Sequence, residues 1–189
     1  MEIIRKPSFF RKKTSRLLKP VQDGRRSGSV LLEFILAFPI ILIISLAIIE
    51  FGFFALLQQT VTAATIEGSR EAAQVGATTT SIGNLIQQYV AINSLYLDVA
   101  QQPAAPGAGD VLVVIQEGGI LPAQTQTIGN SDILCTPVGP PPTPTEVKVT
   151  ICLNLTDTNG TFPLPNLLSS FGFTLSGKQL EISAMTGLE

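Results

Sequence analysis

A single uninterrupted apolar run dominates the hydropathy pattern of the chain. It extends from Val30 to Leu57, and only Glu33 and Glu50 are charged within it. As a helix its 28 residues would extend roughly 42 Å, against a hydrocarbon layer of about 30 Å. The run therefore predicts one membrane-spanning helix at residues 29–57, with a kink at Pro39, where a backbone donor is missing.

Small and apolar residues continue the helical pattern beyond this run. They recur at spacings of three and four, which places them on one helical face: Val61, Ala64, Gly68, Ala72 and Val75. This face allows another element to pack close to the helix backbone. The pattern leaves open whether that element belongs to the same domain or to another subunit. Gly76 is the predicted end of the helix.

A second helix is predicted between residues 80 and 96. Thr80 or Ser81 is a suitable N-terminal cap, and the apolar residues that follow form one broad face: Ile82, Leu85, Ile86, Tyr89, Val90, Ile92, Leu95 and Tyr96. The two tyrosines are interpreted as residues at the edge of the core and not as catalytic phenols. Residues 101–109, rich in Gln, Pro, Ala and Gly, break the helix and act as a linker.

Three strands are predicted after the linker. Residues 111–115 form a short apolar run, residues 147–155 alternate strictly between apolar and polar, and residues 179–186 alternate more weakly. The strict alternation predicts a half-buried antiparallel strand. Between the first two strands lies a polar loop that we expect to be extended and exposed, because it holds five prolines: Pro137, Pro140, Pro141, Pro142 and Pro144.

The charges of the chain are distributed very unevenly. Residues 1–28 hold nine of the 12 Lys and Arg residues and two acids, a net +7, whereas residues 29–189 carry a net −9. The positive-inside rule explains a basic segment beside an apolar run and places it in the cytoplasm. A nucleic-acid interface is disfavoured, because the cluster abuts the apolar run and has no polar or aromatic partners for bases.

Pattern and charge together predict an α+β protein in three parts. Residues 1–28 form a basic leader, residues 29–57 a transmembrane helix, and residues 58–189 an extracytoplasmic domain. The expected architecture is a long kinked N-terminal helix, half transmembrane and half amphipathic, with a second helix and a small antiparallel β-sheet.

The composition excludes several kinds of chemistry. The chain has no His, which removes a His-based triad, an imidazole zinc site and a His general base. No base is evident that would activate a serine. Glu33 and Glu50 lie 17 positions apart, about 26 Å along a helix, too far for an acid–base pair. We therefore expect no enzymatic activity, no cofactor and no metal site.

The two cysteines flank the proline-rich loop. Cys135 and Cys152 lie 17 positions apart, which rules out a catalytic CxxC pair, and two thiols cannot form a structural zinc site without further ligands. A disulfide is favoured if the domain lies outside the cytoplasm. Closing such a loop contributes about 3 kcal/mol in the chain-entropy model.

Glu33 raises the question of how the apolar segment is processed. An intramembrane carboxylate is costly and usually has a partner, and a cut between Gly28 and Ser29 would create an α-amino cation one helical turn away. A solvated carboxylate at the membrane interface is the plainer alternative. An uncleaved anchor also fits, whereas a secretory signal cut near residues 61–63 would be too long.

The N-terminal third resembles the TadE-like pseudopilins of the tight-adherence (Tad/Flp) pilus system. The resemblance rests on the basic segment, Gly28, Glu33-Phe34, Pro39, Ile49-Glu50-Phe51-Gly52 and Gly68-Ser69-Arg70-Glu71-Ala72-Ala73, with a weaker match at residues 180–189. It implies a type IV pilin-like signal cut between Gly28 and Ser29 by a prepilin peptidase. It also implies roles in assembly or in the membrane for Glu33, Pro39, Glu50 and Arg70.

The resemblance implies a minor pilin that assembles or stabilises a Tad pilus. The implied partners are other pilin and pseudopilin subunits, the prepilin peptidase, the inner-membrane pilus platform and membrane lipid, with no nucleic acid. The implied location is a single pass through the cytoplasmic membrane, with the N-terminus in the cytoplasm and the C-terminal domain outside, or an extracellular pilus after assembly. The alternative function is an uncleaved, membrane-anchored binding or sensing module.

Overall fold

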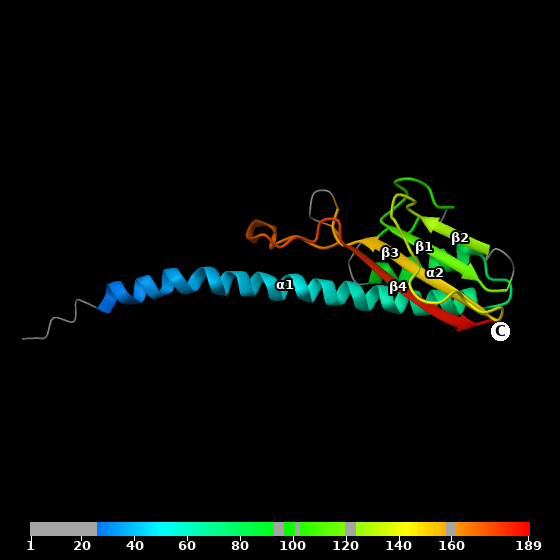
Figure 1. Ribbon diagram of the computed structural model, residues 1–189, viewed down its shortest axis with the longest axis horizontal. Helices are drawn as coiled ribbons and strands as arrows, with labels where there is room; N and C mark the ends of the chain where they lie inside the picture. Colours follow the sequence, from blue (N-terminus) through cyan, green and yellow to red (C-terminus); the bar gives the residue numbers. More distant parts are fainter. Residues whose placement is uncertain (1–25, 93–96, 101–102, 120–123, 158–161) are drawn as a thin grey trace, which may run out of the picture. The chain divides into compact units, whose positions relative to one another are not determined.

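The computed structural model describes residues 26–92, 97–100, 103–119, 124–157 and 162–189. The chain divides into two compact units, Met1–Pro39 and Ile40–Glu189. Helix α1, Arg26–Ala72, supplies the described part of the first unit and continues as the first element of the second. The second unit also contains the other helix and the sheet (Figure 1). Most of the predicted basic leader lies outside the described residues.

The sheet of the second unit has four antiparallel strands in the order β2-β1-β3-β4. Strands β1 (Val111–Glu117) and β3 (Glu146–Asn154) are central, while β2 (Gln124–Gly129) and β4 (Gln179–Gly187) form the edges. The expected α+β class, with a long helix, a second helix and a small antiparallel sheet, is thereby confirmed.

Strand β2 was not expected from the sequence. Its residues, Gln124 to Gly129, lie in the stretch that we assigned to the polar loop, and its first four side chains are exposed. An edge strand with polar residues has no apolar alternation by which to recognise it. Only Ile128, which is 1% exposed, anchors it to the core.

Both helices pack against the same face of the sheet. Helix α1 contacts β3 and β4 through Gly68 and Ser69, and α2 (Thr79–Ile92) contacts β2 through Gly83 and Ile128. The core between the helices and the sheet contains buried aliphatic side chains from α1, α2 and the strands: Leu57, Val61, Ala64, Ile86, Val90, Val113, Ile115, Val149 and Ile151. The small-residue face of α1 therefore packs largely within its own domain.

The end of that face differs from the prediction. Helix α1 ends at Ala72, so Val75 lies beyond it and is 89% exposed. Gly76 follows with φ of +83°, in the left-handed region that glycine tolerates without strain. The chain turns there and enters α2.

The N-terminal cap of α2 also differs from the prediction. The capping residue is Thr78, whose Oγ1 accepts the Ser81 amide at 3.1 Å, while Ser81 Oγ accepts the Thr78 amide at 3.2 Å. This reciprocal pair is a capping box with serine in place of the usual Glu or Gln. Thr80 is thus inside the helix, and Ser81 is the partner of the cap. Leu95 and Tyr96, which we placed on this helix, lie outside the described residues.

The predicted half-buried strand is buried on both faces. In β3, Val149 and Ile151 face the helices, but Lys148, Thr150 and Cys152 on the opposite face are also at most 2% exposed. This outer face carries a second cluster, in which Leu112 and Val114 of β1 and Cys152 of β3 pack with Ile133, Ala104 and Cys135 from outside the strands. Of the polar half of the alternation, Asn154 is exposed as predicted, but Lys148, Thr150 and Cys152 were wrongly assigned to solvent, because the residues that cover them are distant in sequence.

Candidate membrane and assembly site

The first unit presents an apolar helix with a carboxylate near its start. Gly28 and Ser29 both lie within α1, and Ser29 Oγ donates to Glu33 Oε1 at 3.3 Å. The backbones of Ser29 and Glu33 are therefore one helical turn apart, as the spacing predicted. Glu33 is exposed, and so are the apolar side chains around it, including Phe34 at 63%.

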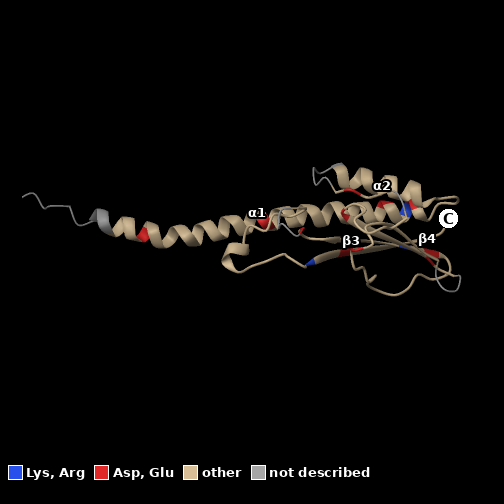
Figure 2. Ribbon diagram, turned by 90° about the horizontal axis from the view of Figure 1, so that it is seen from above, with Lys and Arg blue, Asp and Glu red and all other residues tan. Residues whose placement is uncertain are grey.

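Helix α1 is the one described helix that is long and apolar enough to cross a membrane. In Figure 2 its apolar stretch is tan, because no charged residue lies between Glu33 and Glu50. A row of exposed aliphatic and aromatic side chains is unfavourable in water and favourable in lipid. Pro39 lies within the helix, and the kink expected there stays a prediction.

Glu50 occupies a different environment from Glu33. Its residue is 8% exposed, and its Oε2 accepts the backbone amide of Leu168 at 3.1 Å. Leu168 precedes a short 3-10 helix, Ser169–Phe171, in the segment that connects β3 to β4. Beside this hydrogen bond lies an apolar groove of about 480 Å³ between α1 and the connecting segment. The sequence marked Glu50 as a candidate but gave no sign of its partner.

The Gly68–Arg70 element positions α1 on its domain. A Cβ at Gly68 would lie 3.0 Å from the side chain of Ile86 in α2, so any larger residue would require Ile86 or the helix to shift. Ser69 Oγ and Thr186 Oγ1 share a hydrogen bond of 2.7 Å that joins α1 to β4. Arg70 points to solvent, where its side chain is 63% exposed and pairs with Glu67 at 2.8 Å. Exposed pairs of this kind contribute little to stability.

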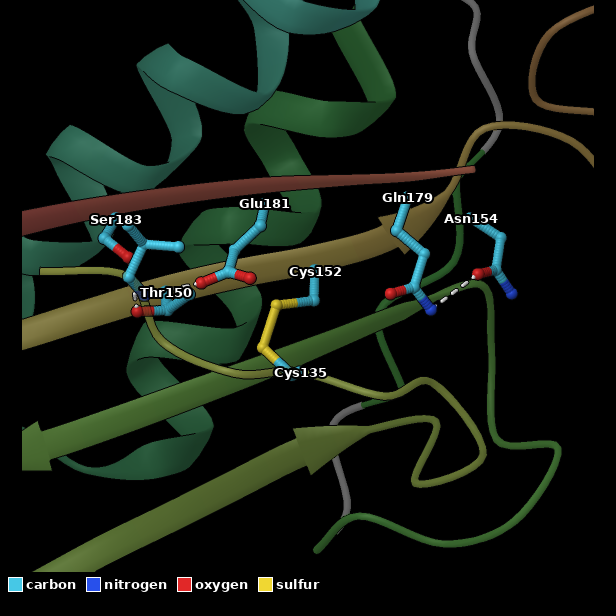
Figure 3. Close-up of a disulfide and its surroundings, with 8 residues drawn as sticks. Cys135, Thr150, Cys152, Asn154, Gln179, Glu181 and Ser183 are labelled. Carbon is cyan, nitrogen blue, oxygen red and sulfur yellow. Dashed lines mark hydrogen bonds between the residues drawn. A yellow bond between two sulfur atoms is a disulfide. The ribbon is translucent and has the colours of Figure 1, made fainter. Parts of the chain in front are cut away.

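The predicted disulfide is confirmed. Cys135 and Cys152 are bonded, with their Cα atoms 5.8 Å apart, and the bond fixes the start of the proline-rich segment to β3 (Figure 3). Lys148 Nζ donates to the carbonyl of Val138 at 2.7 Å, and Glu181 Oε1 accepts the Val138 amide at 2.7 Å. Three side chains of the sheet therefore hold the segment across its outer face.

The proline-rich segment ends in a turn closed by a carboxylate. Glu146 Oε2 accepts the backbone amide of Thr143 at 2.9 Å. This hydrogen bond favours the ionised form and lowers the pKa of Glu146 below its usual range. The outer side of the segment is mostly exposed, as expected, although Pro142 is buried.

Across the described ranges, no cluster of three or more His, Cys, Asp or Glu side chains is arranged to hold a metal ion. The two glutamates of the apolar run do not form one site. Glu33 lies in the first unit, and Glu50 is bonded to a segment of the second.

The comparisons with known proteins agree with the resemblance seen in the sequence. Residues 28–70 match the family model of TadE-like proteins. No curated protein and no solved structure matches the chain. The matched range contains Gly28, Ser29, Glu33, Pro39, Glu50 and Arg70. Residues 28–70 of this chain are therefore similar to TadE-like proteins.

Proposed function

We propose that the chain is a minor pilin, or pseudopilin, which assembles or stabilises a Tad pilus. The observation that carries this proposal is the TadE-like match over an apolar helix in which Glu33 lies one turn from Ser29. Such an arrangement suits a subunit held in a membrane until it joins other pilin-like subunits. Its role is structural, and the partners are pilin and pseudopilin subunits, the pilus platform and membrane lipid.

The proposal includes cleavage between Gly28 and Ser29 by a prepilin peptidase on the cytoplasmic side. The basic leader would hold the N-terminus in the cytoplasm until the cut, with the rest of the chain outside. After the cut, the new Ser29 ammonium would lie within one turn of Glu33 and could neutralise it. The same cation could instead neutralise Glu33 of a neighbouring subunit.

Intact-mass measurement on membrane fractions tests the cleavage. In cells with an active Tad system, the wild-type chain should have lost residues 1–28. Gly28→Leu should retain them, because a bulky residue replaces the small one before the cut. Gly24→Leu, which also changes a leader glycine, should be processed normally. A wild-type protein that keeps its leader would contradict the proposal and favour the uncleaved binding or sensing module.

A further inference from the structure

The segment between β3 and β4 lies beside the apolar part of α1. We call residues 164–175 the aromatic loop, because they include the exposed Phe171 and Phe173. Figures 1 and 2 both show this loop, orange in Figure 1, beside the part of α1 that precedes the helix's contact with the sheet. The hydrogen bond from Leu168 to Glu50 fixes the loop to the helix.

The burial of side chains along α1 shows which part of the helix the aromatic loop covers. Leu42, Ile43, Leu46 and Ala47 are partly buried, whereas Ile41, Ile44 and Ile48 are exposed. The partly buried residues recur with helical spacing and continue to Glu50, so they form the face that the loop covers. The covered face extends eight residues before Glu50, or about 12 Å along a helix.

If the aromatic loop lay in water, the part of α1 that precedes the loop would be too short to span a membrane. A spanning helix needs about 20 apolar residues, and the apolar stretch from Ser29 reaches that length only near Ile49. If the span ended before the covered face, at Ile41, it would have only 13 residues after Gly28. The span and the loop must therefore overlap in depth.

We propose that the aromatic loop is embedded in the outer leaflet, in contact with phospholipid, and that the bilayer surface lies near Glu50 and not at Leu57. This inference rests on the proposed membrane anchoring of α1. Phe171 and Phe173, 41% and 64% exposed, would insert at the boundary of headgroups and acyl chains, as Phe and Leu side chains of membrane-surface helices do.

The composition of the loop fits a lipid environment. No charged residue occurs between Asp157 and Lys178. The second unit as a whole is acidic, so attraction to anionic headgroups does not explain contact with a membrane. The contact is instead hydrophobic, made by aromatic and aliphatic side chains.

Backbone amides of the loop form hydrogen bonds within the protein, which suits a lipid environment. In a medium without water, an unsatisfied amide costs several kcal/mol. Within the loop, the amides of Phe171, Gly172 and Phe173 donate to the carbonyls of Leu168 and Ser169 at 2.9 to 3.3 Å. The Leu168 amide donates to Glu50.

The side chains of Asn166 and Thr174 add to this internal bonding. Asn166 donates to Thr174 Oγ1 at 3.0 Å and accepts the Leu175 amide at 3.3 Å. Glu50 faces the loop, and its carboxylate has a partner inside the protein in the Leu168 amide. The groove beside it, lined by Ala47, Phe51, Phe54, Leu155, Leu168 and Leu175 together with Glu50, suits a phospholipid acyl chain.

Tryptophan fluorescence tests the depth of the loop, because the chain has no Trp. Phe173→Trp places a single probe on the loop with a conservative change at an exposed position. The full chain would be reconstituted in phosphatidylcholine vesicles, with lipids brominated either near the glycerol or near the bilayer centre. Fluorescence should be lost mainly with the shallow bromines. Val75→Trp, 89% exposed beyond the end of α1, should lose none.

Phe38→Trp, inside the apolar stretch, separates this inference from the proposed anchoring. If Phe38→Trp is quenched and Phe173→Trp is not, the anchor stands and the embedded loop is overturned. A blue-shifted but unquenched Phe173→Trp would assign the loop to a protein contact and would also overturn the inference. If neither probe is quenched, the chain is not anchored through α1, and both proposals fail.

Discussion

At the scale of single residues, the two glutamates of the apolar helix differ in how their charge is accommodated. Glu50 is buried and accepts an amide from its own chain, so its charge is accommodated within the fold. Glu33 is exposed, and its one described hydrogen bond comes from the neutral hydroxyl of Ser29. A carboxylate within a transmembrane helix is costly unless it is paired, and the cost is greatest at the bilayer centre. Glu33 therefore needs a cation from outside the described side chains.

Glu33→Gln should abolish assembly while leaving cleavage and membrane insertion intact. The change keeps the shape of the side chain but removes its charge, so an ammonium group of Ser29 would lose its partner in a medium of low dielectric. The mutant should be processed and found in membranes but should no longer co-purify with other pilus subunits.

Glu71→Gln is the control for that substitution, since Glu71 lies on the same helix beyond the apolar stretch. It should co-purify as the wild-type chain does. Normal co-purification and piliation in Glu33→Gln would show that the carboxylate is a solvated group at the interface.

At the scale of elements, the contact of α1 with α2 depends on a missing side chain. Gly68 lies against Ile86, and Ser69 is bonded to Thr186 of β4. Two adjacent residues of one helix thus fix its distance to the second helix and its position on the sheet. Arg70, which follows them, has no such role within the fold, because it is exposed and paired only with its neighbour Glu67.

Gly68→Val should destabilise the domain by about 1–3 kcal/mol, because overpacking forces the buried Ile86 or the helix backbone to move. Thermal unfolding of the membrane-reconstituted chain measures the effect. Gly52→Val is the matched control, since a Cβ at Gly52 meets nothing within 4 Å. Equal melting temperatures for the two variants would mean that the close contact of the helices is not a determinant of stability.

At the scale of the whole molecule, the uneven distribution of charge and the disulfide both fit a domain that lies outside the cytoplasm. The basic leader predicts that the rest of the chain is outside the cytoplasm, where a disulfide persists. The observed bond between Cys135 and Cys152 holds the proline-rich segment on the outer face of the sheet. Without its cover, that face would expose Leu112 and Val114 of β1.

Both thiols should be protected from alkylation in protein taken from its native compartment without reductant. After reduction and unfolding, both should react. Val75→Cys supplies a positive control, because its side chain would be exposed beyond the end of α1 and should label at once. If Cys135 and Cys152 label as freely as this control, the domain is not in an oxidising compartment or the pair does not form.

The sequence predicts most elements of this fold because they are defined by local patterns. The apolar length of α1, the broad apolar face of α2 and the alternation of β3 depend only on neighbours in the chain. With two cysteines, only one pairing within the chain is possible. The spacing of Ser29 and Glu33 is likewise fixed by the helix itself. Strand β2 escaped prediction because its pairing with β1 supplies what its polar sequence lacks.

The tertiary structure alone decided what covers each face. The sequence identified Glu50 as a charge in an apolar run, but its partner Leu168 is 118 positions away. Lys148 and Cys152 had the pattern of solvent-facing residues, yet the proline-rich segment buries them. Periodicity reports which face of an element is apolar, because that depends on adjacent side chains. Which distant segment packs on a face depends on the free energy of long-range contacts, which no local pattern contains.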